Sequence, residues 1–278
     1  MNPRELIRAA ALRFRNAGIP DPENDAALLL SHLTGRPPLE LRLDMDTLLD
    51  ASVLSGFEEL ALKRLDRIPL QYLVGKAPFY HRSFLVDSRV LIPRPETELL
   101  CEWALELIKG RPSPRILDLC CGSGCIGLTL KAEYPDARVT LADISVDALA
   151  VASQNAEALS LDVVLHRGDL LKGFPECSFD LILSNPPYIP AGDCDSLQPE
   201  VLREPRLALD GGMDGCDVYR RIADGARSVL APGGQLLMEL GIDEAEQVSS
   251  LLSACGYTGI RIKNDYAGIQ RMILAARP

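Results

Sequence analysis

From residue 115 to the end of the chain, short apolar runs alternate with longer segments whose apolar residues recur every three or four positions. Short apolar runs are typical of strands buried on both faces, and the three- to four-residue spacing is typical of helices. The alternation predicts an α/β fold with a doubly wound, mostly parallel seven-stranded sheet and helices on both faces. The expected strands are residues 116–119, 139–142, 163–165, 179–183, 235–240, 257–263 and 269–275.

The first 75 residues carry helical spacing instead. Asp21 and Pro22 predict a helix start, with Asp21 as the cap and Pro22 at the first helical position, and Gly35 predicts its end. A further helix is predicted by a stripe at three- and four-residue intervals, made of Val53, Leu54, Phe57, Leu60, Ala61, Arg64, Leu65 and Ile68. We therefore expect a smaller helical domain over residues 1–75, with a structural or partner-binding role.

Two short apolar stretches follow, at residues 79–86 and 89–92, on either side of Asp87-Ser88. They predict a hairpin that joins the helical domain to the α/β domain. The expected division is a helical domain at 1–75, a hairpin linker at 76–95 and the α/β domain at 96–278.

Net charge, hydropathy and cysteine spacing limit which partners, metal sites and locations are expected. The net charge of −10 and the pI of about 4.9 disfavour direct binding to nucleic acid, and no basic tract offsets them. No apolar run approaches the roughly 18 residues of a membrane span, and the start lacks the apolar core of a signal peptide. The eight cysteines lack paired metal-ligand spacing, so we expect free thiols, no metal and a cytoplasmic location.

A glycine turn follows the first strand of the α/β domain. Gly122 and Gly124 allow backbone N–H groups to approach a ligand closely at the start of a helix. Asp143 ends the next strand, where a carboxylate accepts both ribose hydroxyls of a nucleoside. Asp169 and Leu170 follow the third strand, near the expected place of an adenine. The pattern also satisfies the dinucleotide fingerprint, so a nicotinamide dehydrogenase remains an alternative.

The fourth strand stops at Asn185-Pro186-Pro187-Tyr188. Two prolines stiffen this turn and remove backbone N–H donors, which leaves carbonyls free to accept. The Asn185 side-chain oxygen and the Pro186 carbonyl can each accept one N–H of a planar –NH2 group, and the Tyr188 ring can pack on its flat face. Because strands one and four are neighbours in a doubly wound sheet, this grip faces the nucleoside site and favours methyl transfer to nitrogen over hydride transfer. A simple proline turn that ends a strand is the alternative interpretation.

At these residues the chain resembles the class I S-adenosylmethionine-dependent methyltransferases of the amino-methylating type. Further motifs narrow the resemblance to the release factor glutamine methyltransferases, the HemK/PrmC family, across nearly the whole chain. They are Pro69-Leu-Gln-Tyr-Leu-Val-Gly75, Leu91-Ile-Pro-Arg-Pro-Glu-Thr-Glu98, Glu204-Pro-Arg-Leu-Ala-Leu-Asp-Gly-Gly-Met-Asp-Gly215 with Tyr219-Arg220, and Asp265-Tyr-Ala-Gly268.

The resemblance implies a protein methyltransferase that acts on the glutamine amide nitrogen (N5) in the Gly-Gly-Gln motif of class 1 peptide chain release factors and so modulates translation termination. S-adenosyl-L-methionine is the implied cofactor and S-adenosyl-L-homocysteine its product; we expect a monomer. The implied catalytic residues are Asn185, Pro186 and Tyr188, and the implied substrate-binding residues are Asn185, Pro186, Pro187 and Tyr188. The implied cofactor-binding residues are Asp118, Cys120, Cys121, Gly122, Ser123, Gly124, Asp143, Asp169, Leu170 and Asn185.

Two departures from the family pattern concern the cofactor. Cys120 and Cys121 stand where the family has Gly-Thr at the start of its glycine turn, and Cys120 narrows the allowed backbone there. Leu170 replaces a frequent aromatic residue, which predicts weaker stacking on adenine. An adenine-N6 or other nucleic-acid amino methyltransferase is the main alternative, because the same tetrapeptide grips an exocyclic amine. A non-enzymatic, cofactor-binding scaffold is the third interpretation.

Overall fold

The computed structural model describes all 278 residues and divides them into two compact units. Unit 1 contains Met1–Lys76 together with Gln198–Arg203, a short segment from much later in the chain. Unit 2 contains Ala77–Leu197 and Glu204–Pro278. None of the helices is long and apolar enough to cross a membrane.

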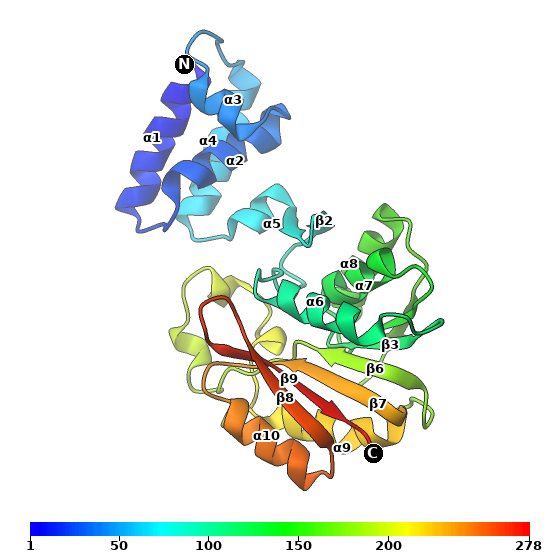
Figure 1. Ribbon diagram of the computed structural model, residues 1–278. Helices are drawn as coiled ribbons and strands as arrows, with labels where there is room; N and C mark the ends of the chain where they lie inside the picture. Colours follow the sequence, from blue (N-terminus) through cyan, green and yellow to red (C-terminus); the bar gives the residue numbers. More distant parts are fainter. The chain divides into compact units, whose positions relative to one another are not determined.

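Unit 1 is helical, as its periodicity predicts (Figure 1). Gly35, in the left-handed conformation with φ 69°, ends the second helix as expected. Asp21 does stand at the N-cap of this helix, but its carboxylate makes no capping hydrogen bond. The helices are α1 (Pro3–Asn16), α2 (Pro22–Thr34), α3 (Pro38–Leu43), α4 (Ala51–Leu65) and α5 (Leu70–Val74), around a core that includes Phe14, Leu29, Leu30, Leu41 and Phe57.

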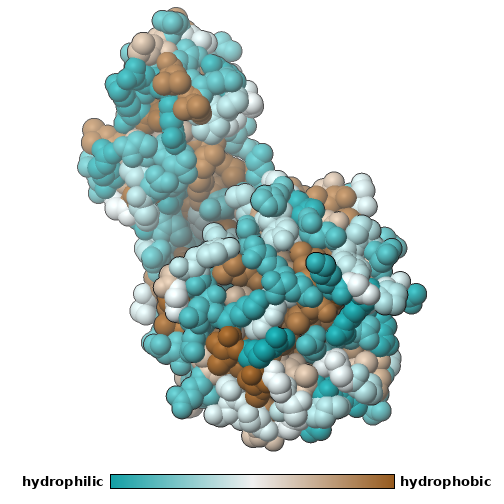
Figure 2. All heavy atoms as spheres, in the orientation of Figure 1, coloured by the Kyte–Doolittle hydropathy of each residue, from teal (hydrophilic) through white to brown (hydrophobic).

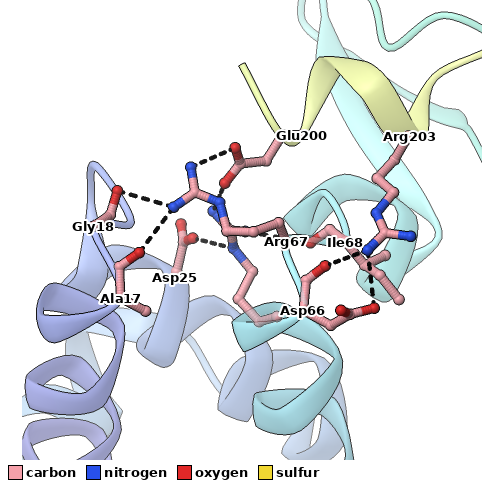
Figure 3. Close-up of polar contacts among 9 residues, drawn as sticks. Ala17, Gly18, Asp25, Asp66, Arg67, Ile68, Glu200 and Arg203 are labelled. Carbon is pink, nitrogen blue, oxygen red and sulfur yellow. Dashed lines mark hydrogen bonds and ion pairs between the residues drawn. The ribbon is translucent and has the colours of Figure 1, made fainter. Parts of the chain in front are cut away.

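Arginine–carboxylate pairs organise the polar interior of unit 1, and Figure 3 labels Asp25, Arg67 and Glu200 among them. Arg64, only 4% exposed, donates through Nε to the Asp25 carboxylate at 2.7 Å and forms an ion pair with Glu200 at 2.9 Å. Arg67 also pairs with Glu200, at 2.7 Å, and Arg203 donates to the Asp66 carbonyl at 2.7 Å. Ion pairs and a hydrogen bond therefore tie the segment Gln198–Arg203 to the helices of unit 1.

Unit 2 has a seven-stranded sheet in the order β5-β4-β3-β6-β7-β9-β8. The first five strands in this order run parallel, and β9 is antiparallel to both β7 and β8. The prediction of a doubly wound, mostly parallel seven-stranded sheet is confirmed. The strands are β3 (Arg115–Leu119), β4 (Arg138–Asp143), β5 (Val164–Arg167), β6 (Phe179–Ser184), β7 (Leu230–Glu239), β8 (Thr258–Asn264) and β9 (Gln270–Ala276).

Helices cover both faces of this sheet (Figure 1). On β3, Ile116 packs into the core beneath α6, α7 and α8, whereas Leu117 packs into the core beneath α9 and α10. This alternation follows from the two-residue period of a strand, and it explains why the central strands are apolar throughout. The helices are α6 (Thr97–Ile108), α7 (Cys125–Glu133), α8 (Val146–Ala158), α9 (Asp217–Val229) and α10 (Ala245–Ala254); η1 (Cys194–Ser196), η2 (Val201–Arg203) and η3 (Arg206–Ala208) are short 3₁₀ turns.

The hairpin predicted around Asp87-Ser88 was placed wrongly. The paired strands are β1 (Lys76–Phe79) and β2 (Arg82–Leu85), and the turn between them is Tyr80-His81. Both turn residues have positive φ, 45° and 61°, as a tight two-residue hairpin requires. Tyr-His carries none of the usual Asn-Gly signal, so the sequence pattern pointed to the next polar pair instead. Asp87 accepts from the Val90 N–H in a turn of its own.

We expect Arg64→Met to destabilise unit 1 strongly. The change leaves the Asp25 carboxylate buried without its cation, a loss of roughly 3–5 kcal/mol in the free energy of unfolding. Urea unfolding followed by circular dichroism at 222 nm measures it. Fluorescence of Trp103, the only tryptophan, follows unit 2 in the same experiment.

The matched control is Arg13→Met. Arg13 forms a two-pronged ion pair with Glu58, at 2.6 and 2.8 Å, but both side chains are largely exposed. Such a pair contributes about 1 kcal/mol or less. Equal losses for the two variants would contradict the role assigned to Arg64, and adding Asp25→Leu to Arg64→Met should restore part of the loss.

Candidate active site

The carboxyl ends of β3 and β6 lie side by side in parallel register, with Leu119 opposite Ser184. The Ser184 hydroxyl, fully buried, donates to the Leu119 carbonyl at 2.7 Å. This bond joins the last residue of one strand to the last residue of its neighbour. The glycine turn after β3 and the Asn-Pro-Pro-Tyr turn after β6 therefore begin at neighbouring positions that this hydrogen bond holds together, as the sheet order predicts.

An open cavity of about 880 Å³, including its mouth, lies at this edge of unit 2. Its walls come from the ends of β3, β4 and β6 and from the loop after β5. Seven of the residues predicted for cofactor or substrate line it: Cys120, Gly122, Asp143, Asp169, Leu170, Asn185 and Pro187. The other predicted residues, which do not line it, are Asp118, Cys121, Ser123, Gly124, Pro186 and Tyr188.

Asp118 lies beneath the cavity, in the core. One carboxylate oxygen accepts from the Gly127 N–H at 2.8 Å, which ties β3 to the first turn of α7, and the other oxygen has no partner. Burial raises the pKa of Asp118 to about 7. Gly127 has no room for a side chain, because a Cβ there would lie 2.3 Å from Leu141. The geometry gives Asp118 a supporting place under the glycine turn.

Asp143 lines the cavity and is hydrogen-bonded to the glycine turn after β3. Its Oδ2 accepts from the Gly122 N–H at 3.0 Å and its Oδ1 from the Ser145 N–H at 2.9 Å. Each carboxylate oxygen keeps a second acceptor site, which suits a pair of ribose hydroxyls. Burial raises the pKa of Asp143, although these N–H groups oppose the shift.

The loop after β5 supplies the opposite wall. Asp169 pairs with Lys172 and Arg221, and these hydrogen bonds hold its pKa below the usual range. Leu170 follows in a left-handed conformation, φ 54°, and is half-buried at the cavity wall. An apolar Leu170 beside the Asp143 carboxylate fits an adenosine, with its flat base and its diol.

The Asn-Pro-Pro-Tyr turn is supported from behind by a glycine stretch. A Cβ at Gly211 would lie 2.7 Å from the Tyr188 Cα, and one at Gly215 would lie 2.5 Å from the Tyr188 carbonyl oxygen. Ile189 donates its N–H to the Leu209 carbonyl at 2.9 Å and accepts from the Gly211 N–H at 2.8 Å. Tyr188 is thereby fixed against backbone, and burial raises its pKa to about 12.

Two polar residues beside Asn185 were missed by the sequence reasoning. Thr97, at the start of α6, receives a hydrogen bond from the Asn185 Nδ2 at 3.3 Å and donates to Glu239 at 2.7 Å. Glu239 ends β7, as Asp143 ends β4, so a lone acid closing an apolar strand was the available signal. Thr97 stands in the stretch from Leu91 to Glu98 that carries the resemblance, but a threonine beginning a helix is ordinary, so its position alone indicated no role.

Comparison with known proteins gives matches to both parts of the chain. Residues 97–212 match the methyltransferase small domain, and residues 5–75 match the PrmC N-terminal domain. A release factor glutamine methyltransferase from Deinococcus radiodurans is 39% identical over 279 residues, covering 100% of this chain and 99% of its own. One from Chlorobaculum tepidum is 42% identical, covering 96% and 94%. This chain belongs to the release factor glutamine methyltransferase family.

The fold agrees with this membership. A crystal structure of a methyltransferase from Pyrococcus furiosus superposes with a TM-score of 0.56 at 18% identity, covering 77% of this chain and 98% of that one. At that identity the likeness shows the fold alone. As a family member, the protein is an S-adenosyl-L-methionine-dependent methyltransferase, and the Asp143 carboxylate, the glycine turn and the apolar Leu170 at the cavity wall fit that cofactor. No group of three or more metal-ligating side chains gathers anywhere in the chain.

The backbone at Cys120 generates the first prediction for this methyltransferase. Cys120 has φ 61°, a left-handed conformation that disfavours a side chain, and it sits where the resemblance places glycine. We expect Cys120→Gly to leave the free energy of unfolding unchanged or raise it by up to about 1 kcal/mol, because strain is released. Urea unfolding followed by Trp103 fluorescence measures the change.

Cys121→Gly is the matched control. Cys121 is buried and has no left-handed backbone, so glycine there removes apolar contacts and should lower the free energy of unfolding by about 1 kcal/mol or more. If both variants lost stability equally, strain at Cys120 would be disproved.

The second prediction concerns Asp143. We expect Asp143→Asn to weaken S-adenosyl-L-homocysteine binding about 10- to 100-fold, because an amide replaces charged hydrogen bonds and points an N–H at the Gly122 or Ser145 N–H. Isothermal titration calorimetry measures it. Asp169→Asn serves as the control, since that carboxylate is already engaged by Lys172 and Arg221; a larger loss at Asp169 than at Asp143 would refute this assignment.

Proposed function

We propose that this protein transfers a methyl group to the N5 amide nitrogen of the glutamine in the Gly-Gly-Gln motif of class 1 peptide chain release factors. The observation that carries the proposal is the placing of Asn185 at the cavity wall beside the glycine turn, in a chain of this family. S-adenosyl-L-methionine supplies an electrophilic methyl group on a sulfonium centre. In this proposal the reaction takes place in the cytoplasm, where release factors act.

The protein's part in the chemistry is to make a poor nucleophile competent. An amide nitrogen attacks weakly, because its lone pair is delocalised into the carbonyl. The Asn185 side-chain oxygen and the Pro186 carbonyl accept the two N–H groups, which concentrates electron density on nitrogen and stabilises the positive charge that grows during attack. Pro187 contributes rigidity, and Tyr188 holds the corner in place through its backbone contacts with Gly211 and Gly215.

Orientation supplies the remaining part of the rate. The Ser184–Leu119 hydrogen bond fixes where the two turns begin, which would hold a bound substrate nitrogen and the methyl group of the cofactor in line. Proton loss can follow transfer, since the methylated amide nitrogen is then strongly acidic. The arrangement therefore needs no strong general base before the methyl group moves.

Partner binding is assigned to the helical domain predicted at residues 1–75, to which Gln198–Arg203 is added by contact. The predicted linker, residues 76–95, belongs by contact to unit 2 from Ala77 onward, and the rest of 96–278 is the catalytic domain. Figure 2 shows brown, hydrophobic side chains interrupting the hydrophilic surface of the helical unit. Four large apolar residues are exposed within ten positions of one another: Leu39, Leu43, Met45 and Leu48. Exposed apolar groups of this kind favour a protein partner, and the net charge of −10 argues against nucleic acid.

The test is a methyl-transfer assay with labelled S-adenosyl-L-methionine and a purified class 1 release factor, with duplex DNA in a parallel reaction. Mass spectrometry of the peptide that carries Gly-Gly-Gln should show one methyl group on glutamine. Label in DNA alone would instead establish the adenine methyltransferase, and no turnover at all would leave only a cofactor-binding scaffold.

Asn185→Ala should lower the rate of methyl transfer by on the order of 100-fold or more, because one preorganised acceptor of the transition state is lost. Single-turnover kinetics measures the rate, and calorimetry with S-adenosyl-L-homocysteine shows whether the cofactor site persists. A folded Asn185→Ala protein with near-normal methylation would refute the assigned role of Asn185.

A further inference from the structure

Glu239 is a buried carboxylate next to the Asn-Pro-Pro-Tyr turn. It ends β7, which pairs with β6 so that Met238 lies opposite Ser184. Glu239 is the residue after Met238, and Asn185 is the residue after Ser184. Glu239 is 2% exposed, and no lysine or arginine forms an ion pair with it. Burying a carboxylate without a cationic partner costs folding free energy unless neighbouring groups donate hydrogen bonds to it. The neighbours of Glu239 therefore explain why it is tolerated.

Those neighbours are two hydrogen-bonding side chains. The Thr97 hydroxyl donates to Glu239 Oε2 at 2.7 Å, and Thr97 is itself 2% exposed. Asn185 Nδ2 donates to the same Thr97 oxygen at 3.3 Å. The charged groups around Glu239 are Arg271, which favours its ionised form, and Glu96, which opposes it.

Counting donors and acceptors shows which group donates in each hydrogen bond of the series Asn185–Thr97–Glu239. An ionised carboxylate only accepts, so the single Thr97 proton must point to Glu239. The Thr97 lone pairs then face Asn185, and only the –NH2 branch of the Asn185 amide can satisfy them. The other branch, Oδ1, receives no hydrogen bond from the protein and remains free to accept.

From this geometry we propose that Thr97 and Glu239 are positioning residues that hold the Asn185 amide with its oxygen toward the substrate nitrogen. The inference rests on the proposed function and extends it to two further residues. If the amide were turned over, its –NH2 group would face the substrate –NH2 group, donor against donor, and the substrate nitrogen would lose an acceptor.

The backbone segment that precedes Thr97 is also held in place by buried contacts. The carboxylate of Glu204 accepts from the Ile92 N–H at 2.9 Å and pairs with Arg94, and the Glu204 side chain is 1% exposed. This clamp fixes the segment that leads from Ile92 into α6. Burial raises the pKa of Glu239 to about 7, and the hydrogen bond from Thr97 opposes that shift. The hydrogen bonds that orient the Asn185 amide are therefore all formed when Glu239 is ionised and accepts from Thr97.

The decisive variant is Thr97→Val, which keeps the shape and removes the hydroxyl. We expect the single-turnover rate to fall about 10-fold, the size of one lost hydrogen bond at a transition-state acceptor. KM for the release factor and the affinity for S-adenosyl-L-homocysteine should stay within about twofold, because Thr97 touches neither in this assignment. Thr97→Ser, which retains the hydroxyl, should restore the rate.

Thr129→Val is the matched control. Thr129 is fully buried in α7, and its hydroxyl has no hydrogen-bond partner, so the same chemical change there should leave the rate unaltered. Glu239→Gln is the second variant if Thr97→Val fails to fold. A glutamine can accept from or donate to Thr97, so the hydroxyl direction is no longer imposed, and we expect a fall of about threefold.

A measurement independent of turnover uses protein labelled with ¹⁵N-asparagine. The Asn185 side-chain –NH2 protons, assigned by their loss in Asn185→Ala, should exchange with solvent roughly 10-fold faster in Thr97→Val than in the unaltered protein. Unchanged exchange overturns the inference, whatever the substrate. An unaltered protein inactive on release factor overturns the proposed function instead, and an active one with a fully active Thr97→Val overturns the inference alone.

Discussion

The hydrogen bond from Ser184 to the Leu119 carbonyl is the contact on which the active site depends. It joins the ends of two parallel strands, one followed by the glycine turn and the other by the Asn-Pro-Pro-Tyr turn, and both turns contribute residues to the cavity wall. A shift of β6 by one residue would exchange the faces of every side chain on that strand. It would also separate Asn185 from the cavity. The register of the central strands is therefore a condition of the chemistry as well as of the core.

Buried acids recur at this edge of the sheet. Asp118 and Glu239 lie at or near strand ends, each with one oxygen bonded to a neighbouring element, and burial raises the pKa of both to about 7. Each binds its proton more tightly in the folded than in the unfolded chain. The stability they contribute is complete at acid pH and is lost as the pH rises through about 7. Both acids thus weaken the fold at working pH while they orient groups that serve the site.

The sequence pattern was sufficient for the sheet and for much of the cavity. The central strands are apolar throughout, and Gly122, Asp143 and Asn185 stand at strand ends, where side chains converge. The pattern failed where geometry came from tertiary contacts. Tyr80 and His81 turn a hairpin with left-handed backbones that neither residue type favours, and Thr97 acquires its role only because β7 brings Glu239 beside it. Asp118 is a cofactor residue only by the family resemblance, and no pattern in the sequence indicated that it would be fully buried with one oxygen bonded to the Gly127 N–H.

The inserted segment Gln198–Arg203 has a consequence for how the helical unit matures. Arg64 and Arg67 draw one of their anionic partners, Glu200, from a stretch that the ribosome makes only after β3, β4, β5 and β6. The newly made helical bundle therefore emerges with Arg64 paired to Asp25 and with Arg67 still without its carboxylate partner. Its charge balance is completed by residues synthesised long afterwards, so its final stability arrives late in translation.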